Sequence, residues 1–436
     1  MPTYSDTLSF LDSFINYERT GMDSSERAFD LDKLREVLKK AGDPHENYHS
    51  VHVTGTKGKG SVCSFVSSVL KEAGYRVGLF TSPHLLTVRE RIQTDGEFIS
   101  EEDFVSALEH IKKYLDSSGP RGRFTYFEIL TLMAMAHFSI KKCDYAVFEV
   151  GMGGRFDATN VINADVCGIS PISYDHTHVL GSTIEMITKE KAEIIKKKTR
   201  CVSSPQEEAA LEIIRDKCAE EEAALSVVGK DITYRPLEMD ESGSLFDIAG
   251  KKGSYKECRT NMPGAFQLSN CATAVGICEE LLEGKGGIDG KTVKRGIERA
   301  FIPGRMEVLS RRPLVVIDGA QNGESAKRLR DSVEKIFKYN KLVLILGVSR
   351  DKDIKNICGH LTPMADEVIL TKASVERAAD PLLLRGYVKG KDVKVTGDVK
   401  EALGIAFGKA GAGDMILATG SFFVIGEVRR LILDNR

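Results

Sequence analysis

Short apolar runs alternate with amphipathic segments along most of this chain, a pattern typical of strands and helices that follow each other in turn. Residues 5–41 carry apolar positions at helical spacing, so we expect helices with Leu8, Leu11, Phe14 and Ile15 on one face and Leu31, Leu34, Val37 and Leu38 on another. The apolar run at 51–54 predicts a strand, residues 62–73 a helix and residues 76–80 a second strand. Together these three elements form a βαβ unit.

The same alternation continues through the first 302 residues. Residues 81–96 are polar and irregular, and we expect a loop there, lying over the start of the preceding helix. Further elements are predicted as follows: helices at 101–115 and 127–140 with a Ser-Gly-Pro-Arg-Gly break at 118–122, strands at 144–150 and 165–169, small antiparallel strands within 226–256, and a helix at 266–282.

A second α/β alternation begins beyond Arg305. It predicts strands at 314–318, 342–347, 368–371 and 415–418 and a helix at 324–339, which is the pattern of a smaller Rossmann-like domain. A chain of 436 residues is too long for one ordinary core, in agreement with two domains. We place the boundary at a Pro303-Gly304 hinge, so that residues 1–302 form the N-terminal domain and residues 303–436 the C-terminal domain.

The first predicted strand runs into a glycine-rich turn that opens a helix. The turn comprises Gly55, Thr56, Lys57, Gly58, Lys59, Gly60 and Ser61. Its glycines let backbone N–H groups converge on a phosphate, Lys59 can reach the terminal phosphates, and Ser61 can hold Mg²⁺. Gly60 separates Lys59 from Ser61, which departs from the common P-loop spacing, and a turn without a ligand is the alternative reading. We predict an α/β fold with a P-loop-type N-terminal ATPase domain on a mainly parallel sheet.

Polar groups follow two other predicted strands. Glu149 lies at the end of one strand, and His176 follows the next. Because ligands of open α/β sheets bind at the carboxyl ends of the strands, we expect both side chains at the same edge as the glycine-rich turn. A helix cap for Glu149 and a hydrogen-bonded core histidine for His176 are the alternatives.

Composition narrows the class of protein. The net charge of -2 shows no basic bias, so nucleic acid is not an expected partner. No uncharged apolar stretch is long enough to span a bilayer, and residues 1–6 lack a basic region followed by an apolar run, so we expect a cytoplasmic protein without a membrane partner. The nine cysteines are scattered without a Cys-x-x-Cys pair, which predicts buried thiols.

Many separate motifs, in order, resemble the folylpolyglutamate synthase/dihydrofolate synthase family, a branch of the Mur ligase superfamily. The match covers nearly the whole chain, and the run from Glu149 to Asn160 is close to diagnostic of the folate branch. The matching stretches are 54–61, 82–84, 125–128, 149–160, 175–176, 190–192, Asn270, 303–305, 318–320, 351–353 and 419–421.

The resemblance implies an ATP-dependent ligase that joins L-glutamate to dihydropteroate or to (tetrahydro)folate. The acid would first be converted to an acyl phosphate, which the amine of glutamate attacks, and the product nucleotide is ADP. The family further implies ATP and Mg²⁺ as cofactors, small-molecule substrates only, and a monomer.

Site residues are carried over from the family motifs position by position. Lys59, Lys191, Glu149 and His176 are the implied catalytic residues, and Ser61, Ser82, Glu149 and His176 the implied metal ligands. Lys191 resembles a carbamylated lysine, which requires a neutral amine and hence a pKa well below about 10.4. The alternative for Lys191 is a solvated lysine in a charged run.

The remaining implied contacts belong to the substrates. Asn270, Arg305 and Asp318 resemble nucleotide contacts, with Arg305 reaching ATP only when the domains close. Thr125, Phe127 and Asp157 match pterin-binding positions, although Phe127 could be helix core and Asp157 a turn former. Gln321 and Ser421 are weaker candidates on the glutamate side.

One position departs from the family pattern. Gln321 stands where the family usually carries histidine, and a neutral amide cannot take up a proton. This puts in doubt any role of the position as a base. Two alternatives to a folate ligase remain open: a Mur-type carboxylate-amine ligase acting on another acid, and a nucleotide-binding regulatory protein without ligase activity.

Overall fold

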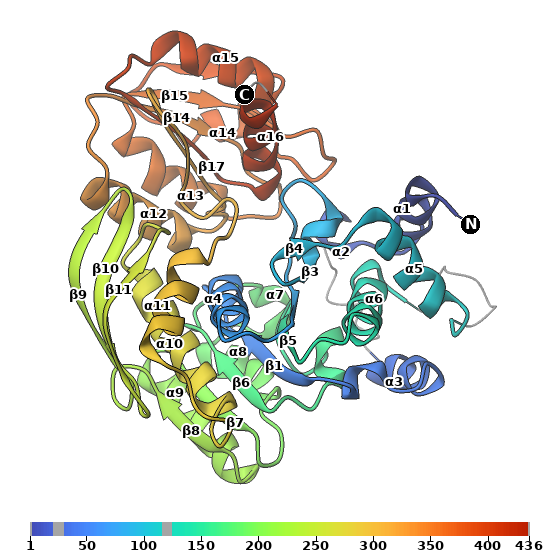
Figure 1. Cartoon of the computed structure of the whole chain (residues 1–436). Helices are drawn as coiled ribbons and strands as arrows, with labels where there is room; N and C mark the ends of the chain where they lie inside the picture. Colours follow the sequence, from blue (N-terminus) through green and yellow to red (C-terminus); the bar gives the residue numbers. More distant parts are fainter. Residues whose placement is uncertain (1, 21–29, 116–123, 435–436) are drawn as a thin grey trace.

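The computed structural model describes residues 2–20, 30–115 and 124–434. Two large sheets, each covered by helices on both faces, lie one above the other, and a small third sheet stands beside the lower one (Figure 1). The lower body carries the N-terminal three hundred or so residues, and the upper body carries the C-terminal part of the chain (Figure 1).

The N-terminal body is built on an eight-stranded sheet of order β4-β3-β2-β5-β1-β6-β7-β8. The strands β2, β5, β1, β6, β7 and β8 pair in parallel with their neighbours. At one edge of the sheet, β3 pairs antiparallel with both β2 and β4. Apart from His49 at the start of β1, the residues of the central strands β1, β5 and β6 are buried, as expected for parallel strands covered on both faces. The strands are β1 His49–Thr54, β2 Val77–Phe80, β3 Ile92–Thr94, β4 Glu97–Phe98, β5 Tyr145–Glu149, β6 Val166–Ile169, β7 Arg200–Ser203 and β8 Ala224–Val227.

Helices cover both faces of this sheet. Helix α4 packs on the sheet and against α10 and α11 on one face, and α6 packs with α5 on the other. The first group comprises α4 Lys59–Glu72, α10 Phe266–Leu281 and α11 Gly290–Arg299; the second comprises α1 Tyr4–Asp12, α2 Tyr17–Thr20, α3 Leu31–Lys40, α5 Glu101–Lys112 and α6 Tyr126–Ile140; α7 Thr177–Leu180, α8 Ile184–Ala192 and α9 Glu208–Glu220 surround a further apolar cluster; single 3₁₀ turns span Pro44–Glu46, Val88–Arg91 and Ala158–Val161.

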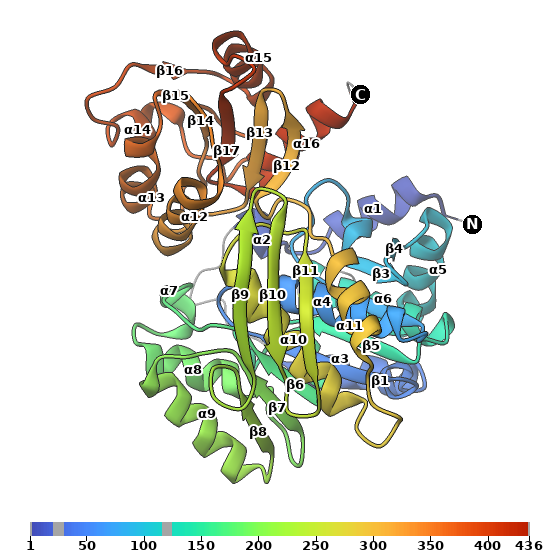
Figure 2. The same cartoon turned by 60° about the vertical axis from the view of Figure 1, so that its left-hand side comes forward.

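The third sheet is a three-stranded antiparallel sheet that stands upright beside α10 and α11 (Figure 2). It consists of β9 Thr233–Asp240, β10 Gly243–Ala249 and β11 Ser254–Thr260. Phe246, Ile248 and Cys258 point into the core shared with α10, whereas most of β9 is exposed. These strands confirm the antiparallel strands predicted within 226–256.

The C-terminal body has a six-stranded sheet of order β12-β13-β17-β14-β15-β16, parallel except for the β12–β13 pair. Apolar clusters fill both of its faces. Its elements are β12 Glu307–Arg311, β13 Leu314–Asp318, α12 Gly323–Ile336, β14 Leu342–Leu346, α13 Ile354–Leu361, a 3₁₀ turn Thr362–Met364, β15 Glu367–Leu370, α14 Pro381–Arg385, β16 Val393–Val395, α15 Val399–Lys409, β17 Met415–Thr419 and α16 Phe422–Leu433. This confirms the mixed α/β fold with a second, smaller sheet domain.

Three local predictions are wrong. Ile15 is half exposed because it follows the end of α1 and forms a bridge with Thr125, so it does not continue the apolar face of Leu8, Leu11 and Phe14. The predicted loop at 81–96 contains a 3₁₀ turn and strand β3, which pairs with β2. Helix α4 begins at Lys59, three residues earlier than predicted, inside the glycine-rich turn. The predicted helical residues 21–29 and the break at 118–122 lie outside the described residues.

Two compositional predictions can be checked directly. All nine cysteines are buried free thiols, as predicted. Among the helices of the described residues, none combines the length and the apolar composition that a bilayer crossing needs.

Candidate active site

A cavity of about 1190 Å³ lies between the two bodies and is lined by residues of both. The glycine-rich turn after β1, the end of β5 and the segment after β6 line it from the N-terminal body, and the turn after β13 and the start of α16 line it from the C-terminal body. Carboxyl ends of parallel strands therefore meet here, where α/β sheets bind ligands.

The glycine-rich turn passes so close to its neighbours that two of its positions require glycine. Gly55 has φ +142°, and a Cβ there would lie 2.0 Å from the Ser170 hydroxyl oxygen. Gly58 has φ +88°, and its Cβ would lie 2.5 Å from Oδ1 of Asn270. Side chains at either position would push the backbone away from β6 or α10, so the sequence of the turn is explained by its packing.

Some polar groups of the turn are already hydrogen-bonded to the segment that follows β6. The N–H groups of Thr56 and Lys57 both donate to the carbonyl of Pro171, at 3.0 and 3.2 Å. The Thr56 hydroxyl and the backbone of Ser173 are hydrogen-bonded to each other as well. Donors for a phosphate must therefore come from the later part of the turn, where α4 begins and its N-terminal N–H groups face the cavity.

Two lysines converge on a single carbonyl oxygen of the turn. Nζ of Lys191 donates to the carbonyl of Gly55 at 2.8 Å, and Nζ of Lys59 donates to the same oxygen at 3.3 Å. Lys191 is buried on α8, and burial together with the charge of Lys59 lowers its pKa to about 7. A substantial neutral fraction at physiological pH is the condition that carbamylation of Lys191 requires.

Glu149 lies at the end of β5, buried beside the start of α4. Its Oε2 accepts a hydrogen bond from the Ser82 N–H at 3.0 Å, and a Cβ on Gly60 would lie 3.4 Å from it. Burial raises the pKa of Glu149, although Lys59, the Ser82 N–H and Arg305 oppose the shift. A cation bound beside this buried carboxyl group would stabilise its ionised form in the same way as these positive charges do.

The donor set is the one that Mg²⁺ accepts. A carboxylate at Glu149 and a hydroxyl at Ser61 are hard oxygen ligands, and both line the cavity. Burial lowers the pKa of His176 to about 4, so its imidazole is neutral and able to act as a ligand. In the described ranges there is no group of three or more His, Cys, Asp or Glu side chains placed to hold a metal ion by themselves.

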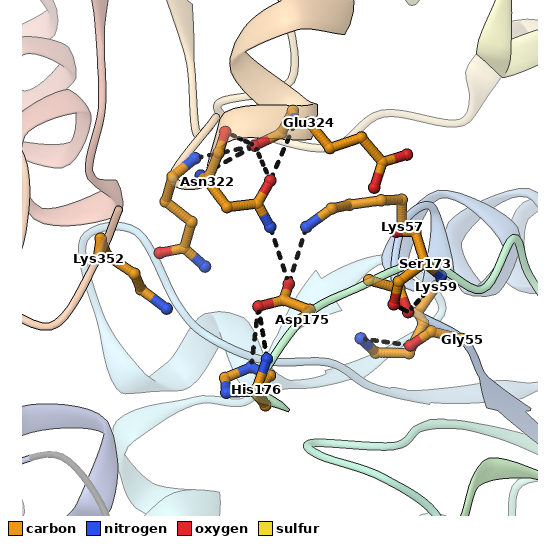
Figure 3. Close-up of polar contacts among 12 residues, drawn as sticks. Gly55, Lys57, Lys59, Ser173, Asp175, His176, Asn322, Glu324 and Lys352 are labelled. Carbon is orange, nitrogen blue, oxygen red and sulfur yellow. Dashed lines mark hydrogen bonds and ion pairs between the residues drawn. The ribbon is translucent and has the colours of Figure 1, made fainter. Parts of the chain in front are cut away.

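Asp175 joins the two bodies next to this site. Its Oδ2 accepts hydrogen bonds from Nζ of Lys57 at 2.8 Å and from Nδ2 of Asn322 at 3.0 Å, as Figure 3 shows. Asn322 caps the start of α12, so it belongs to the C-terminal body. Burial would raise the pKa of Asp175, but Lys57 and His176 hold it below its ordinary value, and the carboxylate stays charged.

Arg305 and Asp318 face the cavity from the C-terminal body. Asp318, at the end of β13, accepts hydrogen bonds from the N–H groups of Met306 and Ala320, both at 2.9 Å. Burial raises the pKa of Asp318 while the charge of Arg305 opposes this. The guanidinium of Arg305 lies over the ring of Phe422, 4.7 Å from its centre, which holds it toward the cavity.

The three residues predicted to bind the pterin also line this cavity. Thr125 caps α6 through reciprocal hydrogen bonds with Glu128. The ring of Phe127 lies against Gly151, where a Cβ would be 2.7 Å from its Cζ, and 5.7 Å from the ring of Phe80. Asp157 is buried and caps the 3₁₀ turn that follows it.

Most, but not all, of the predicted residues meet at the cavity. Gln321 lines it, whereas Asn270 and Ser421 are not among its described lining residues. Asn270 instead contacts the glycine-rich turn and donates to Gln267 at 2.9 Å. Ser421 is buried, and its hydroxyl caps α16 by accepting the N–H of Phe423. The cap explains this serine by itself.

Sequence reasoning missed a second connection between the bodies. Arg91 is buried and forms an ion pair with Glu18, and its Nε donates to Nδ1 of His84 at 2.7 Å. Nη1 of Arg377 in the C-terminal body donates to the carbonyl of Glu18 at 2.5 Å. Glu18, Arg91 and Arg377 are far apart along the chain, so no local pattern could have grouped them.

Comparisons with known proteins agree with this arrangement. Residues 53–278 match the Mur ligase middle domain, and residues 304–422 match the Mur ligase glutamate ligase domain. The chain is 30% identical over 404 residues to the dihydrofolate synthase/folylpolyglutamate synthase of Bacillus subtilis, covering 92% of this chain and 94% of that protein.

Solved structures are similar over the full length. Mycobacterium tuberculosis folylpolyglutamate synthase complexed with ADP has a TM-score of 0.90 and 31% identity, covering 98% of both chains. Escherichia coli FolC in complex with DHPP and ADP has a TM-score of 0.88 and 27% identity, covering 100% of this chain and 99% of that one. With both domain matches and a relative at this identity, the chain belongs to the folylpolyglutamate synthase/dihydrofolate synthase family of Mur ligases.

Proposed function

We propose that this protein is an ADP-forming ligase that joins the amine of L-glutamate to the carboxylate of dihydropteroate, of folate, or of both. The observation that carries the proposal is one cavity in which a phosphate-binding turn, the buried carboxylate Glu149 and the aromatic Phe127 lie together between two bodies. The names of its relatives and the ADP in their solved structures support the same reaction.

Two chemical steps would occur in this cavity. A carboxylate oxygen of the pteroate or folate attacks the γ-phosphorus of ATP, the bond to the β–γ bridging oxygen breaks, and ADP leaves. The amine of glutamate then attacks the acyl carbon, loses a proton, and displaces inorganic phosphate. Negative charge gathers on phosphate oxygens in both steps, and we assign its stabilisation to Lys59 of the N-terminal body and Arg305 of the C-terminal body, two of the cations that line the cavity.

Mg²⁺ would be held by Glu149, His176 and the hydroxyl of Ser61 or Ser82, and when bound it supplies charge neutralisation for the phosphates. Glu149 is suited to this role because its carboxyl group is buried and burial raises its pKa, so a bound cation would stabilise its ionised form. Lys191 would carry a carbamate, for which its low pKa and its position beside Lys59 are favourable. The carbamate would turn a cation into an anion that balances Lys59.

Exclusion of water follows from the contacts between the bodies. An acyl phosphate hydrolyses if water reaches it, so the two bodies must stay closed during the reaction. Asp175, with Lys57 on one side and Asn322 on the other, holds them together next to the phosphate-binding turn. We place the domain boundary between residues 302 and 303, with Pro303-Gly304 as the hinge and a monomer as the working unit.

The acceptor acid would bind with its pterin against Phe127, Thr125 and Asp157. Glutamate would approach from the C-terminal body, where Gln321 lines the cavity. Because an amide cannot take a proton, the amine of glutamate would lose its proton to solvent or to phosphate. Asn270 and Asp318 are proposed on the nucleotide side, Asn270 acting through the glycine-rich turn that it contacts.

The test is ADP release with defined pairs of substrates. We expect turnover with dihydropteroate plus L-glutamate, with tetrahydrofolate plus L-glutamate, or with both, and none when either the acid or the amine is omitted. D-glutamate serves as the control for recognition of the amine. Turnover with a different acid alone would favour a Mur-type ligase, and hydrolysis indifferent to acid and amine would favour a regulatory ATPase; either result would overturn the proposal.

A further inference from the structure

A buried histidine of β1 lies behind the pterin side of the cavity without lining it. His52 is fully buried, and its Nε2 lies 2.7 Å from the hydroxyl oxygen of Thr159. Its other ring nitrogen, Nδ1, is buried without a hydrogen-bond partner in the described part of the chain. Burial lowers the pKa of His52 to about 3, so the imidazole is neutral and carries one proton, on one nitrogen or the other.

Thr159 connects this imidazole to Asp157. The Thr159 hydroxyl lies 2.5 Å from Oδ1 of Asp157, and the Thr159 N–H donates to the same oxygen at 3.0 Å. The other oxygen, Oδ2, accepts the N–H of Met152 at 2.9 Å. A carboxylate offers about four acceptor positions, and these three hydrogen bonds fill three of them. Burial raises the pKa of Asp157, whereas the Thr159 hydroxyl and the N–H groups of Met152, Thr159 and Gly151 oppose the shift and favour the carboxylate. Asp157 itself lines the cavity.

Hydrogen bonds among His52, Thr159 and Asp157 can run in one of two orders of donation, and one of them is favoured. If His52 carries its proton on Nε2, it donates to Thr159, and Thr159 in turn donates to Asp157, which accepts as a carboxylate. In the reverse arrangement Nδ1 would carry the proton, leaving a buried N–H donor unpaired. An unpaired buried N–H is rarer and more costly than an unused acceptor. The first arrangement is therefore favoured.

The order of donation decides whether Asp157 offers a hydrogen-bond acceptor or a donor to a ligand in the cavity. With backbone donors and the Thr159 hydroxyl filling three acceptor positions, a proton added to Asp157 would occupy the remaining position and make it a donor. A carboxylate held ionised keeps that position as an acceptor. The amino-pyrimidine edge of a pterin presents N–H donors, so only the ionised form is complementary to it.

We propose that His52 and Thr159 are positioning residues that keep Asp157 an acceptor toward the cavity, and thereby select ligands whose edge donates an N–H group. This inference deepens the proposed function and rests on it, since it assumes that a pterin occupies the cavity. His52 acts through Thr159, and neither residue touches the ligand. The structural alternative is that Asp157 and Thr159 only shape the turn at 158–161.

The experiment measures ligand selectivity by equilibrium fluorescence titration. Pteroic acid is compared with its 2-desamino analogue and with its N3-methyl analogue, because each analogue removes one of the two N–H donors. The unmodified protein should bind at least one analogue about 10- to 100-fold more weakly than pteroic acid, the range expected for one hydrogen bond to a charged group. ATP affinity is measured in parallel as an internal control.

The variants separate positioning from packing. Thr159→Val removes the hydroxyl and keeps the shape, so selectivity between pteroic acid and the analogue should fall to within about 3-fold while ATP affinity is kept. Thr159→Ser keeps the hydroxyl and should restore selectivity. His52→Leu should weaken selectivity, and His52→Gln, which retains an N–H donor, should keep more of it than His52→Leu.

Binding of pteroic acid and discrimination against its analogues test different claims. If pteroic acid does not bind the unmodified protein, the proposed function fails and this inference with it. If pteroic acid binds but neither analogue is discriminated against, or if Thr159→Val keeps full selectivity, the positioning role is wrong while the proposed function stands. Equal loss in Thr159→Val and Thr159→Ser would likewise assign Thr159 to packing alone.

Discussion

The amine of Lys191 should respond to carbon dioxide in a way that an ordinary lysine does not. Its pKa of about 7 compares with an ordinary value of 10.5. At pH 8 this leaves about 90% of the amine neutral, against about 0.3% for an ordinary lysine, so the form that reacts with CO₂ is about 300-fold more abundant. The cause is burial beside Lys59, which penalises the ammonium form.

We therefore expect withdrawal of CO₂ at pH 8 to lower the rate of ADP release, and bicarbonate to restore it. The bicarbonate-dependent part of the rate should decline as the pH falls through about 7, because Lys191 then takes up a proton. ¹³C-bicarbonate should give a carbamate resonance on the protein by NMR. Lys191→Arg, which stays protonated, should give neither effect.

Two results would refute this reasoning. If the rate is independent of CO₂ and no carbamate resonance appears, Lys191 acts as an amine. If the pH dependence of its acetylation in the folded protein gives a pKa above about 9, the effect of burial on Lys191 has been overstated, whatever the rate shows.

Three further predictions concern closure, the glycine-rich turn and the metal. Asn322→Asp places a carboxylate beside Asp175, so we expect at least a 10-fold loss of kcat/KM and an increased radius of gyration by X-ray scattering; an unchanged radius with full activity would argue against the contact. Gly55→Ala forces a Cβ to within 2.0 Å of Ser170 and should abolish ATP binding in a titration, whereas Gly74→Ala, with nothing within 4 Å, should cost only about 1 kcal/mol of stability; equal effects would contradict the packing argument. Removal of divalent ions by EDTA should stop ADP release without shifting the unfolding temperature of the nucleotide-free protein, and a large shift would indicate a structural metal instead.

The phosphate-binding edge of the site could be predicted from sequence because each of its residues lies in a short sequence pattern of its own. Apolar runs mark the strands, and the polar residue at the end of each run is carried to a known edge of the sheet. Glu149, His176 and the turn from Gly55 to Ser61 were found in this way, and all line the cavity. Lys191 was predicted only from the family motifs. It lies in a charged stretch of the sequence, which gives no sign that its side chain is buried.

The contacts between distant segments could not be predicted. Lys57 and Asp175 are 118 positions apart, and Arg91 and Glu18 are 73 apart, so no periodicity relates them. A buried ion pair reads in the sequence as two solvated charges. Ser421 shows the opposite error, since a serine that follows a strand and caps the next helix is easily mistaken for a ligand contact.

Because all nine thiols are buried, the rate at which they react with a thiol dye can be used to follow unfolding of the protein. A thiolate reacts far faster than a thiol, and burial raises the pKa of Cys63, Cys271 and Cys278, so disulfide-forming dyes should label the native protein slowly. Unfolding of the N-terminal body would release eight of them and unfolding of the C-terminal body would release Cys358, so labelling rates would follow the opening of each body. A single cysteine added to the surface could be derivatised with a fluorophore without first deleting the native ones.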